Sequence, residues 1–138
     1  MSRPNLHPAR RSLLLGAVLL AAATAGCVRQ PVDTPPKSVV FFTANSADLD
    51  APARGVIREF VADAQTAPTR RVTVLGYADV AGSPEANRML SALRAKIVAD
   101  ELVAGGIAPG RSSQRPRGAV PNSDPGIEAR RVELELAR

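Results

Sequence analysis

Residues 76–95 read GYADVAGSPEANRMLSALRA, a stretch in which a strand gives way to a helix. The residues just before it, 71–77 (RVTVLGY), are rich in β-branched side chains and favour a buried strand. Pro84 suits the first turn of a helix and Gly105-Gly106 suits its end, so we predict a helix over residues 84–104. The side chains expected to face the sheet from this helix are Ala86, Leu90, Leu93, Ile97 and Ala104.

Three polar residues of this stretch are expected at one crevice. Asp79 directly follows the strand, at the carboxyl edge where α/β sheets usually bind ligands. Asn87 and Arg94 are about two helical turns apart and project at nearly the same angle. A carboxylate pairs with an ammonium and a guanidinium grips a carboxylate, so the set suits a zwitterionic ligand. The alternative is that Asp79 merely caps the helix and pairs with Arg94 internally.

Residues on the N-terminal side of this stretch predict a strand and a second helix. Residues 38–42 (SVVFF) have the composition of a buried strand. Asp50 and Pro52 favour the start of a helix, and Pro68 favours its end. The apolar stripe of this helix comprises Val56, Ile57, Phe60, Val61 and Ala64.

Residues on the C-terminal side predict two more strands. Residues 111–118 form the first, and residues 131–136 alternate strictly between apolar and charged side chains. Val132, Leu134 and Leu136 are expected to face the core, with Glu133 and Glu135 facing away. The order βαβαββ predicts an α/β two-layer sandwich with two helices packed on one mixed sheet.

The N-terminus has the pattern of an export signal over residues 1–26. Residues 1–12 contain three arginines and no acidic residue, and Leu13–Ala23 is an unbroken run of eleven small or aliphatic residues. A membrane-spanning helix needs about 20 apolar residues, and this run meets Arg29 before reaching that length. We therefore predict a cleaved signal peptide.

A lipid attachment site and a tether follow the signal. Thr24-Ala25-Gly26-Cys27 resembles the bacterial lipobox, in which the cysteine thiol receives diacylglycerol, and Cys27 is the sole cysteine. The alternatives are an incidental cysteine in a secreted protein and an uncleaved anchor. Residues 28–37 contain three prolines and predict an extended linker of about 30 Å. The sequence thus predicts a lipidated tether over residues 27–37 and a domain over residues 38–138.

Composition excludes several classes of function. The chain has 18 Lys+Arg and 13 Asp+Glu, but Arg3, Arg10 and Arg11 lie in the predicted signal, which leaves a net charge of 15 − 13 = +2. That charge is too small for a surface that tracks phosphates, so no nucleic-acid partner is expected. The single histidine is His7, also in the signal, so triad catalysis and a zinc site are excluded and no enzyme, metal or cofactor is predicted.

The quoted stretch resembles the signature of the OmpA C-terminal-like, peptidoglycan-associating domain. The resemblance covers residues 38–136 and includes the opening Phe41-Phe42 with Asn45-Ser46-Ala47 and the closing Arg130-Arg131-Val132-Glu133. The matching residues in the central stretch are Gly76, Asp79, Gly82, Ser83, Asn87, Leu90, Ser91, Arg94 and Ala95.

This resemblance implies non-covalent binding of peptidoglycan through meso-diaminopimelate in its stem peptide. It implies that Asp79 and Arg94 clamp the amino and carboxylate groups of that residue, with support from Asn45, Asn87 and Arg130. The alternative for the two asparagines is structural, Asn45 in its own turn and Asn87 at the start of its helix. Three positions depart from the signature, namely Ala78, Gly126 and Ala129, which replace Thr, Arg and Asn.

These observations together predict a lipoprotein that tethers the envelope. Val28 follows Cys27 where Asp is the usual signal for retention in the inner membrane, so we expect a lipid-anchored, periplasm-facing protein of the cell outer membrane. The alternative function is a periplasmic assembly or adaptor module of the same fold that mainly binds an envelope protein, motivated by Ala78, Ala129 and the short tether.

Overall fold

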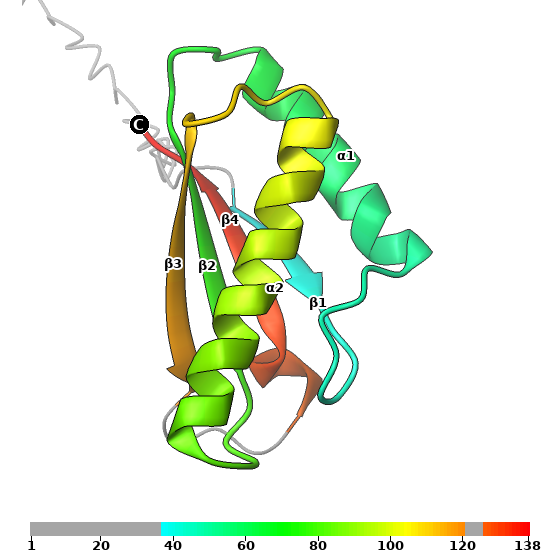
Figure 1. Cartoon of the computed structure of the whole chain (residues 1–138). Helices are drawn as coiled ribbons and strands as arrows, with labels where there is room; N and C mark the ends of the chain where they lie inside the picture. The colour runs from blue at the N-terminus through cyan, green and yellow to red at the C-terminus, as the bar shows by residue number, and fades with distance from the viewer. Residues whose placement is uncertain (1–36, 121–125) are drawn as a thin grey trace, which may run out of the picture. The chain divides into compact units, whose positions relative to one another are not determined.

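The computed structural model describes residues 37–120 and 126–138 (Figure 1). The predicted signal peptide, Cys27 and residues 28–36 of the predicted tether lie outside the described residues. In the order of the chain the elements are β1 (Lys37–Phe41), α1 (Ala51–Gln65), β2 (Val72–Ala78), α2 (Pro84–Ala104), β3 (Ser112–Ala119), the 3-10 helix η1 (Ile127–Ala129) and β4 (Arg131–Leu136). Among the described residues, no helix is both long and apolar enough to cross a membrane.

The four strands form one mixed sheet in the order β1-β4-β2-β3. β4 lies between β1 and β2 and is antiparallel to both, whereas β2 and β3 are parallel neighbours joined through α2. Both helices lie on the same side of the sheet (Figure 1). The predicted βαβαββ two-layer sandwich is therefore confirmed, with η1 as an added turn before the last strand.

Both helices begin at a capping side chain followed by proline; Asp50 and the two prolines were predicted from the sequence, whereas the Ser83 cap was not. The Asp50 carboxylate accepts a 2.8 Å hydrogen bond from the Ala53 N–H at the start of α1. Ser83 Oγ accepts from the Ala86 N–H at 3.1 Å and caps α2 in the same way. The bounds predicted for α2 and β4 match the structure, while β1, β2 and β3 are displaced by one residue.

The prediction for the buried face of α2 is wrong. Leu93 is 49% exposed, and Ala86 and Ala104 are also exposed, while Leu90 and Ile97 are only half-buried. The face that packs on the sheet comprises Asn87, Ser91, Arg94, Ala95, Val98, Ala99 and Leu102. The physical reason is that the polar side chains of Asn87, Ser91 and Arg94 occupy the N-terminal part of this face, and Ser91 and Arg94 are hydrogen-bonded inside the protein.

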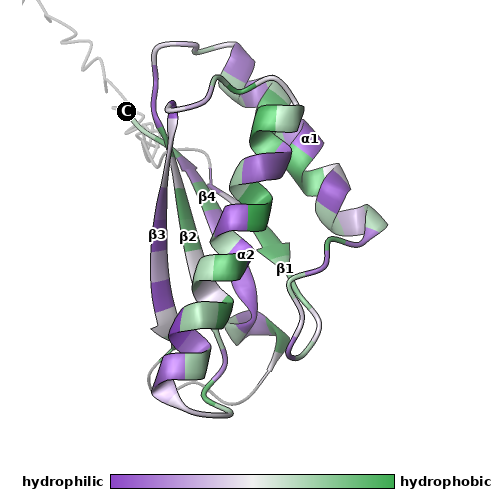
Figure 2. Cartoon of the chain, in the orientation of Figure 1, coloured by the Kyte–Doolittle hydropathy of each residue, from purple (hydrophilic) through white to green (hydrophobic). Residues whose placement is uncertain are grey.

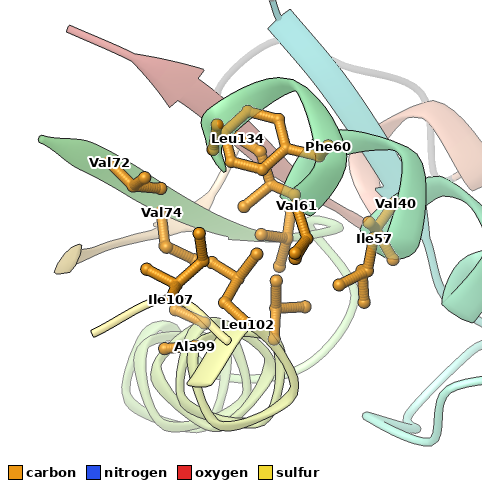
Figure 3. Close-up of a cluster of buried hydrophobic side chains, with 14 of the residues drawn as sticks. Val40, Ile57, Phe60, Val61, Val72, Val74, Ala99, Leu102, Ile107 and Leu134 are labelled. Carbon is orange, nitrogen blue, oxygen red and sulfur yellow. The ribbon is translucent and has the colours of Figure 1, made fainter. Parts of the chain in front are cut away.

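The core lies between the two helices and the sheet. Figure 2 shows alternating hydrophobic and hydrophilic bands along both helices, as expected when each buries one side. Side chains from α1, α2 and the central strands point toward one another in Figure 3. The large, fully buried members include Ile57, Phe60, Val72, Leu102 and Leu134.

Two glycines allow α2 to approach the sheet closely. A Cβ on Gly76 would lie 2.1 Å from the carbonyl oxygen of Ser91, so β2 can contact α2 here only through a glycine. Gly118 has a φ of +70° and follows a β-bulge, in which Arg117 is the extra residue on β3 opposite Gly76 and Tyr77. The Gly118 N–H donates to Ser91 Oγ at 3.0 Å, which fixes the bulge to the helix.

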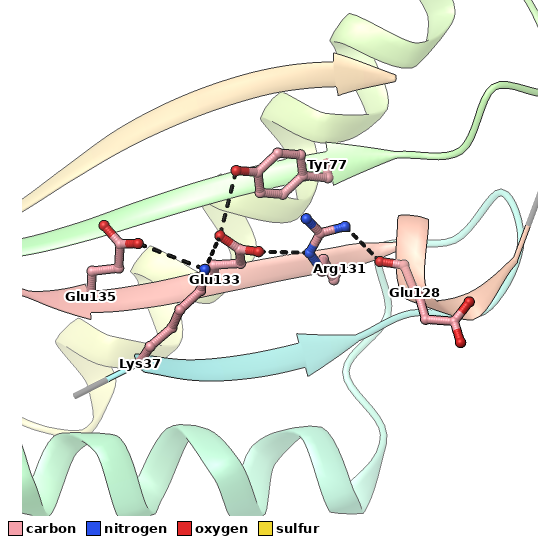
Figure 4. A network of polar contacts seen from close by, with 6 residues as sticks. All are labelled: Lys37, Tyr77, Glu128, Arg131, Glu133 and Glu135. Atoms are coloured by element: carbon pink, nitrogen blue, oxygen red, sulfur yellow. Dashed lines mark hydrogen bonds and ion pairs between the residues drawn. The ribbon is translucent and has the colours of Figure 1, made fainter. Parts of the chain in front are cut away.

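The sheet face opposite the helices carries a polar network centred on Glu133 (Figure 4). Glu133 forms ion pairs with Lys37 at 2.8 Å and Arg131 at 2.7 Å, and Tyr77 donates to it at 3.4 Å. Burial raises the pKa of Glu133, but the hydrogen bonds from Lys37 and Arg131 outweigh this effect and hold the pKa below 4.5. The bond to Glu133 likewise raises the pKa of Lys37 above 10.5. Glu133 thus points away from the core, as predicted, yet is buried by its partners.

Candidate functional site

Arg94 lies at the base of the candidate site and is fully buried. Its Nε donates to the carbonyl oxygen of Ser46 at 2.8 Å, Nη1 to that of Tyr77 at 3.0 Å and Nη2 to that of Thr43 at 3.1 Å. The guanidinium carbon lies 5.1 Å from the centre of the Phe42 ring. Arg94 therefore connects α2 with the loop after β1 and with the end of β2.

Burial lowers the pKa of Arg94, because the charged guanidinium loses its hydration. The negative charge of Asp79 acts in the opposite direction, and the positive charge of Arg130 lowers the pKa further. The structure thus brings Arg94, Asp79 and Arg130, three of the residues predicted for the site, close enough to interact through their charges. Three donated bonds leave two of the five N–H groups of the guanidinium without a described acceptor.

Asp79 occupies the turn between β2 and α2. Its Oδ1 accepts a 3.1 Å hydrogen bond from the Ala81 N–H, and its Oδ2 lies 3.5 Å from Arg130 Nη1. The alternative considered from the sequence, a helix cap paired with Arg94, is wrong on both points, because Ser83 caps α2 and the ion pair is with Arg130. The side chain remains 14% exposed, so the carboxylate reaches the surface.

Arg130 follows η1 and lies above the same crevice. Its Nε donates to the Phe42 carbonyl at 3.2 Å, and its own carbonyl accepts from the Phe42 N–H at 2.8 Å. The side chain is 20% exposed, so Arg130 and Asp79 together present an ion pair to solvent. Ala78 and Ala129, two of the positions that differ from the family signature, directly precede Asp79 and Arg130 in the chain, and both are buried.

Asn45 lies at the exposed tip of the loop held by Arg94. Its φ of +53° is in the left-handed region, which asparagine tolerates better than most residues. The turn closes through a 3.4 Å bond from the Ser46 N–H to the Thr43 carbonyl. Arg94 bonds the carbonyls of those same two residues, so it fixes the position of Asn45 relative to Asp79.

Asn87 shares the buried face of α2 with Arg94 and is 5% exposed. Its side-chain amide has no hydrogen-bond partner among residues 37–120 and 126–138. In those ranges, every side-chain nitrogen or oxygen that is closed to solvent does have a hydrogen-bond partner. The amide therefore reaches solvent through a pocket that Asn87 lines together with Val80 and Gly82. The structural alternative, in which Asn87 supports the start of α2, has no side-chain bond to support it.

Two features of the site were not predicted. The three acceptors of Arg94 are backbone carbonyls, which leave no mark in a sequence. Arg117 reaches the pocket beside Asn87 only because of the bulge in β3, for which the adjacent Gly118 was the available signal. Cys27 lies outside the described residues, and within them no cluster of His, Cys, Asp and Glu could hold a metal ion.

The sequence matches a known family over most of the folded part. Residues 41–125 match the model of the OmpA family, which is more than half of the chain, so the chain belongs to that family. The peptidoglycan-binding proteins ArfA of Mycobacterium tuberculosis and Mycobacterium bovis are 55% identical over 58 residues. That match covers 41% of this chain and only 18% of the length of those relatives.

Solved structures share the fold at low identity. The OmpA-like domain of FopA1 from Francisella tularensis superposes with a TM-score of 0.66 at 24% identity, covering 72% of this chain and 73% of that one. The peptidoglycan-associated lipoprotein from Burkholderia pseudomallei gives 0.62 at 19% identity, covering 72% and 88%. The periplasmic domain of Helicobacter pylori MotB gives 0.62 at 21% identity, covering 77% and 78%. These likenesses establish the fold.

Proposed function

We propose that this domain binds peptidoglycan non-covalently through meso-diaminopimelate in the stem peptide. The observation that carries the proposal is the partly exposed pair of Asp79 and Arg130, whose opposite charges lie 3.5 Å apart above buried Arg94. The free end of diaminopimelate carries an ammonium and a carboxylate on one carbon atom. The ammonium of such a zwitterion can take the place of Arg130 beside Asp79, and its carboxylate can take the place of Asp79 beside Arg130. The names of the ArfA relatives, which are peptidoglycan-binding proteins, support peptidoglycan as the polymer that is bound.

Each site residue has a distinct role in this proposal. Asp79 binds the ammonium, and Arg130 binds the carboxylate from the surface. Arg94 contributes its positive charge from below and positions the loop and strand end that carry the site. Asn45 and Asn87 contribute side-chain amides to the binding of the stem peptide. The proposal includes no catalytic step.

We further propose that the whole protein is a lipoprotein of the outer membrane. A signal peptide over residues 1–26 is removed, Cys27 carries the lipid, and residues 28–37 link it to the domain. Lipid chains contribute about 0.8 kcal/mol for each buried CH₂ group, so several long chains anchor a protein stably. The protein then joins the membrane to the cell wall.

A second candidate function, an adaptor that binds an envelope protein, is favoured by apolar side chains on the outer face of α2. Met89 is 68% exposed and Leu93 is 49% exposed. They line a groove of about 760 Å³ that extends to Gln114 on β3. Peptidoglycan binding requires the ion pair of Asp79 and Arg130, whereas an adaptor would use this groove.

Sedimentation with purified sacculi separates the two candidates. The detergent-solubilised full chain is mixed with sacculi that contain diaminopimelate, and the pellet is assayed for protein. We expect wild type and Leu93→Ser in the pellet and Asp79→Ala in the supernatant. Wild type that stays in the supernatant would contradict peptidoglycan binding and favour the adaptor.

A further inference from the structure

A pocket of about 400 Å³ lies beside the candidate site, between the start of α2 and the end of β3. It begins at Val80, the residue after Asp79, so the two sites are continuous along the chain. Its lining residues are Val80, Gly82, Pro84, Asn87, Arg88, Arg117 and Ala119. Two arginines and an amide contribute polar groups, and no acidic side chain of the described residues lines the pocket.

The charges of Arg88 and Arg117 are not neutralised within the described part of the chain. Neither guanidinium has a hydrogen bond or an ion pair there, in contrast to Lys37, Arg54 and Arg131, which each bond a carboxylate. Two like charges at one pocket repel each other unless an anion lies between them. The pocket therefore favours a negatively charged ligand group.

The local backbone places both arginines at this pocket. Arg117 is the extra residue of the β-bulge, and a bulge redirects a side chain relative to its neighbours in the strand. A Cβ on Gly118 would lie 3.4 Å from Arg88 Cγ, so the glycine leaves room for the aliphatic part of Arg88. Ser91 Oγ accepts from the Gly118 N–H and donates to the Arg88 carbonyl, which connects the two segments.

Asn87 provides a second and independent indication of a ligand. Its side chain is more than nine-tenths buried and lines the pocket, and its amide bonds no described residue. The amide reaches solvent through this pocket, so its hydrogen-bonding groups are open to a ligand that enters the pocket. The start of the 21-residue helix α2, which favours anions, lies at the same place.

We propose that this pocket binds a second carboxylate of the stem peptide, the α-carboxylate of the γ-linked D-glutamate that precedes diaminopimelate. The inference rests on the proposed function, because diaminopimelate at Asp79 places the preceding residue nearby. Arg88 and Arg117 then bind the carboxylate, and the Asn87 amide donates to it. A stem peptide in which this carboxylate is amidated loses its charge, so the domain distinguishes the two forms of the polymer.

Calorimetric titration of the full chain with two synthetic tripeptides tests the inference. The peptides are L-alanyl-γ-D-glutamyl-meso-diaminopimelate and the same peptide with the glutamate α-carboxylate converted to an amide. We expect wild type to bind the amidated peptide about tenfold more weakly, the scale of one charge-assisted hydrogen bond. The double variant Arg88→Gln/Arg117→Gln is expected to bind both peptides as weakly as wild type binds the amidated one.

Arg115→Gln is the matched control, since it removes the same charge from an exposed position of β3 that does not line the pocket. This control variant is expected to keep the full wild-type preference for the peptide with a free carboxylate over the amidated one. Equal affinities in wild type, or a preference that survives in the double variant, would overturn the inference while leaving the proposed function intact. Failure of wild type to bind either peptide would overturn the proposed function itself and the inference with it.

Discussion

Arg94 donates hydrogen bonds to the carbonyls of Thr43 and Ser46, the residues on either side of the Ala44-Asn45 turn. It donates a third bond to the carbonyl of Tyr77, which is two residues before Asp79 in the chain. One buried side chain thus sets the spacing between an exposed asparagine on one loop and a partly exposed carboxylate on another. The site is thus hydrogen-bonded at its base and partly exposed at its surface.

The role of Arg94 predicts that its replacement affects both the fold and the site. Arg94→Ala leaves three carbonyls near the core without a donor, and we expect a loss of about 3 kcal/mol or more in the free energy of unfolding. Arg94→Lys is also expected to destabilise the protein, because an ammonium cannot reproduce the planar arrangement of donors. Denaturant unfolding measures the effect. Arg115→Ala, at an exposed position, serves as the control, and an unchanged midpoint for Arg94→Ala would contradict this role.

The close approach of β2 and α2 predicts that Gly76 is intolerant of any side chain. In Gly76→Ala the new Cβ would meet the Ser91 carbonyl at 2.1 Å, so the helix must shift, at a cost of about 1–3 kcal/mol or more. Gly55 in α1 is the matched control, since the nearest atom to a Cβ there is Arg58 Nη2 at 3.9 Å. Gly55→Ala is expected to stabilise the protein by up to about 1 kcal/mol. Equal melting temperatures for the two variants would disprove the steric constraint.

The network on the open face predicts a dependence of stability on pH. The pKa of Glu133 in the folded state lies below its ordinary value, so the ionised form is favoured by folding. Its contribution to stability is therefore present above the unfolded pKa of about 4.5 and is lost as the pH falls through the folded value.

Glu133→Gln should accordingly be less stable than wild type at pH 7, and the difference should shrink at pH 3. Glu59→Gln, at an exposed position of α1, is the control for removing one acidic group. Urea unfolding at both pH values gives the comparison. A difference between Glu133→Gln and wild type that is the same at pH 3 and pH 7 would show that the carboxylate charge is irrelevant.

The proposed lipid anchor predicts that attachment of lipid to the protein depends on the side chain of Cys27. Wild type grown with an alkyne-labelled fatty acid should carry the label and fractionate with the outer membrane. Cys27→Ser should carry none and keep its signal peptide, because the thiol that receives diacylglycerol is absent. Normal processing and sorting of Cys27→Ser would eliminate the anchor, and recovery of labelled wild type mainly in the inner membrane would refute the proposed location.

Much of the fold could be predicted because its signals are local. The bounds of α2 follow from Pro84 and Gly105-Gly106, and those of β4 follow from strict alternation. The buried face of α2 could not be predicted, because this alanine-rich helix has no clear apolar stripe and its inner face holds Asn87 and Arg94. Arg94 is tolerated there through its bonds to backbone carbonyls and Asn87 through its access to the neighbouring pocket, and a periodic pattern contains neither.

The members of the candidate site are predictions from the sequence, whereas its geometry is given only by the structure. Asp79, Arg94, Asn87, Asn45 and Arg130 were all selected from the sequence, and the structure places Asp79 and Arg130 in an ion pair over Arg94. The pairing depends on η1, whose position is set by packing between segments more than 40 residues apart in the sequence. The bulge that brings Arg117 to the neighbouring pocket is likewise a product of strand pairing.

The central claim is that Asp79 and Arg130 bind the zwitterionic end of diaminopimelate, and calorimetric titration with the free tripeptide tests it most directly. Asp79→Asn and Arg130→Gln each leave a ligand charge unpaired, at a cost of about 2–5 kcal/mol, so we expect at least about 30-fold weaker binding by each variant. Asp100→Asn, on the exposed side of α2, should bind like wild type. If both site variants bind the tripeptide as tightly as wild type and Asp100→Asn do, the ion pair is not the binding site.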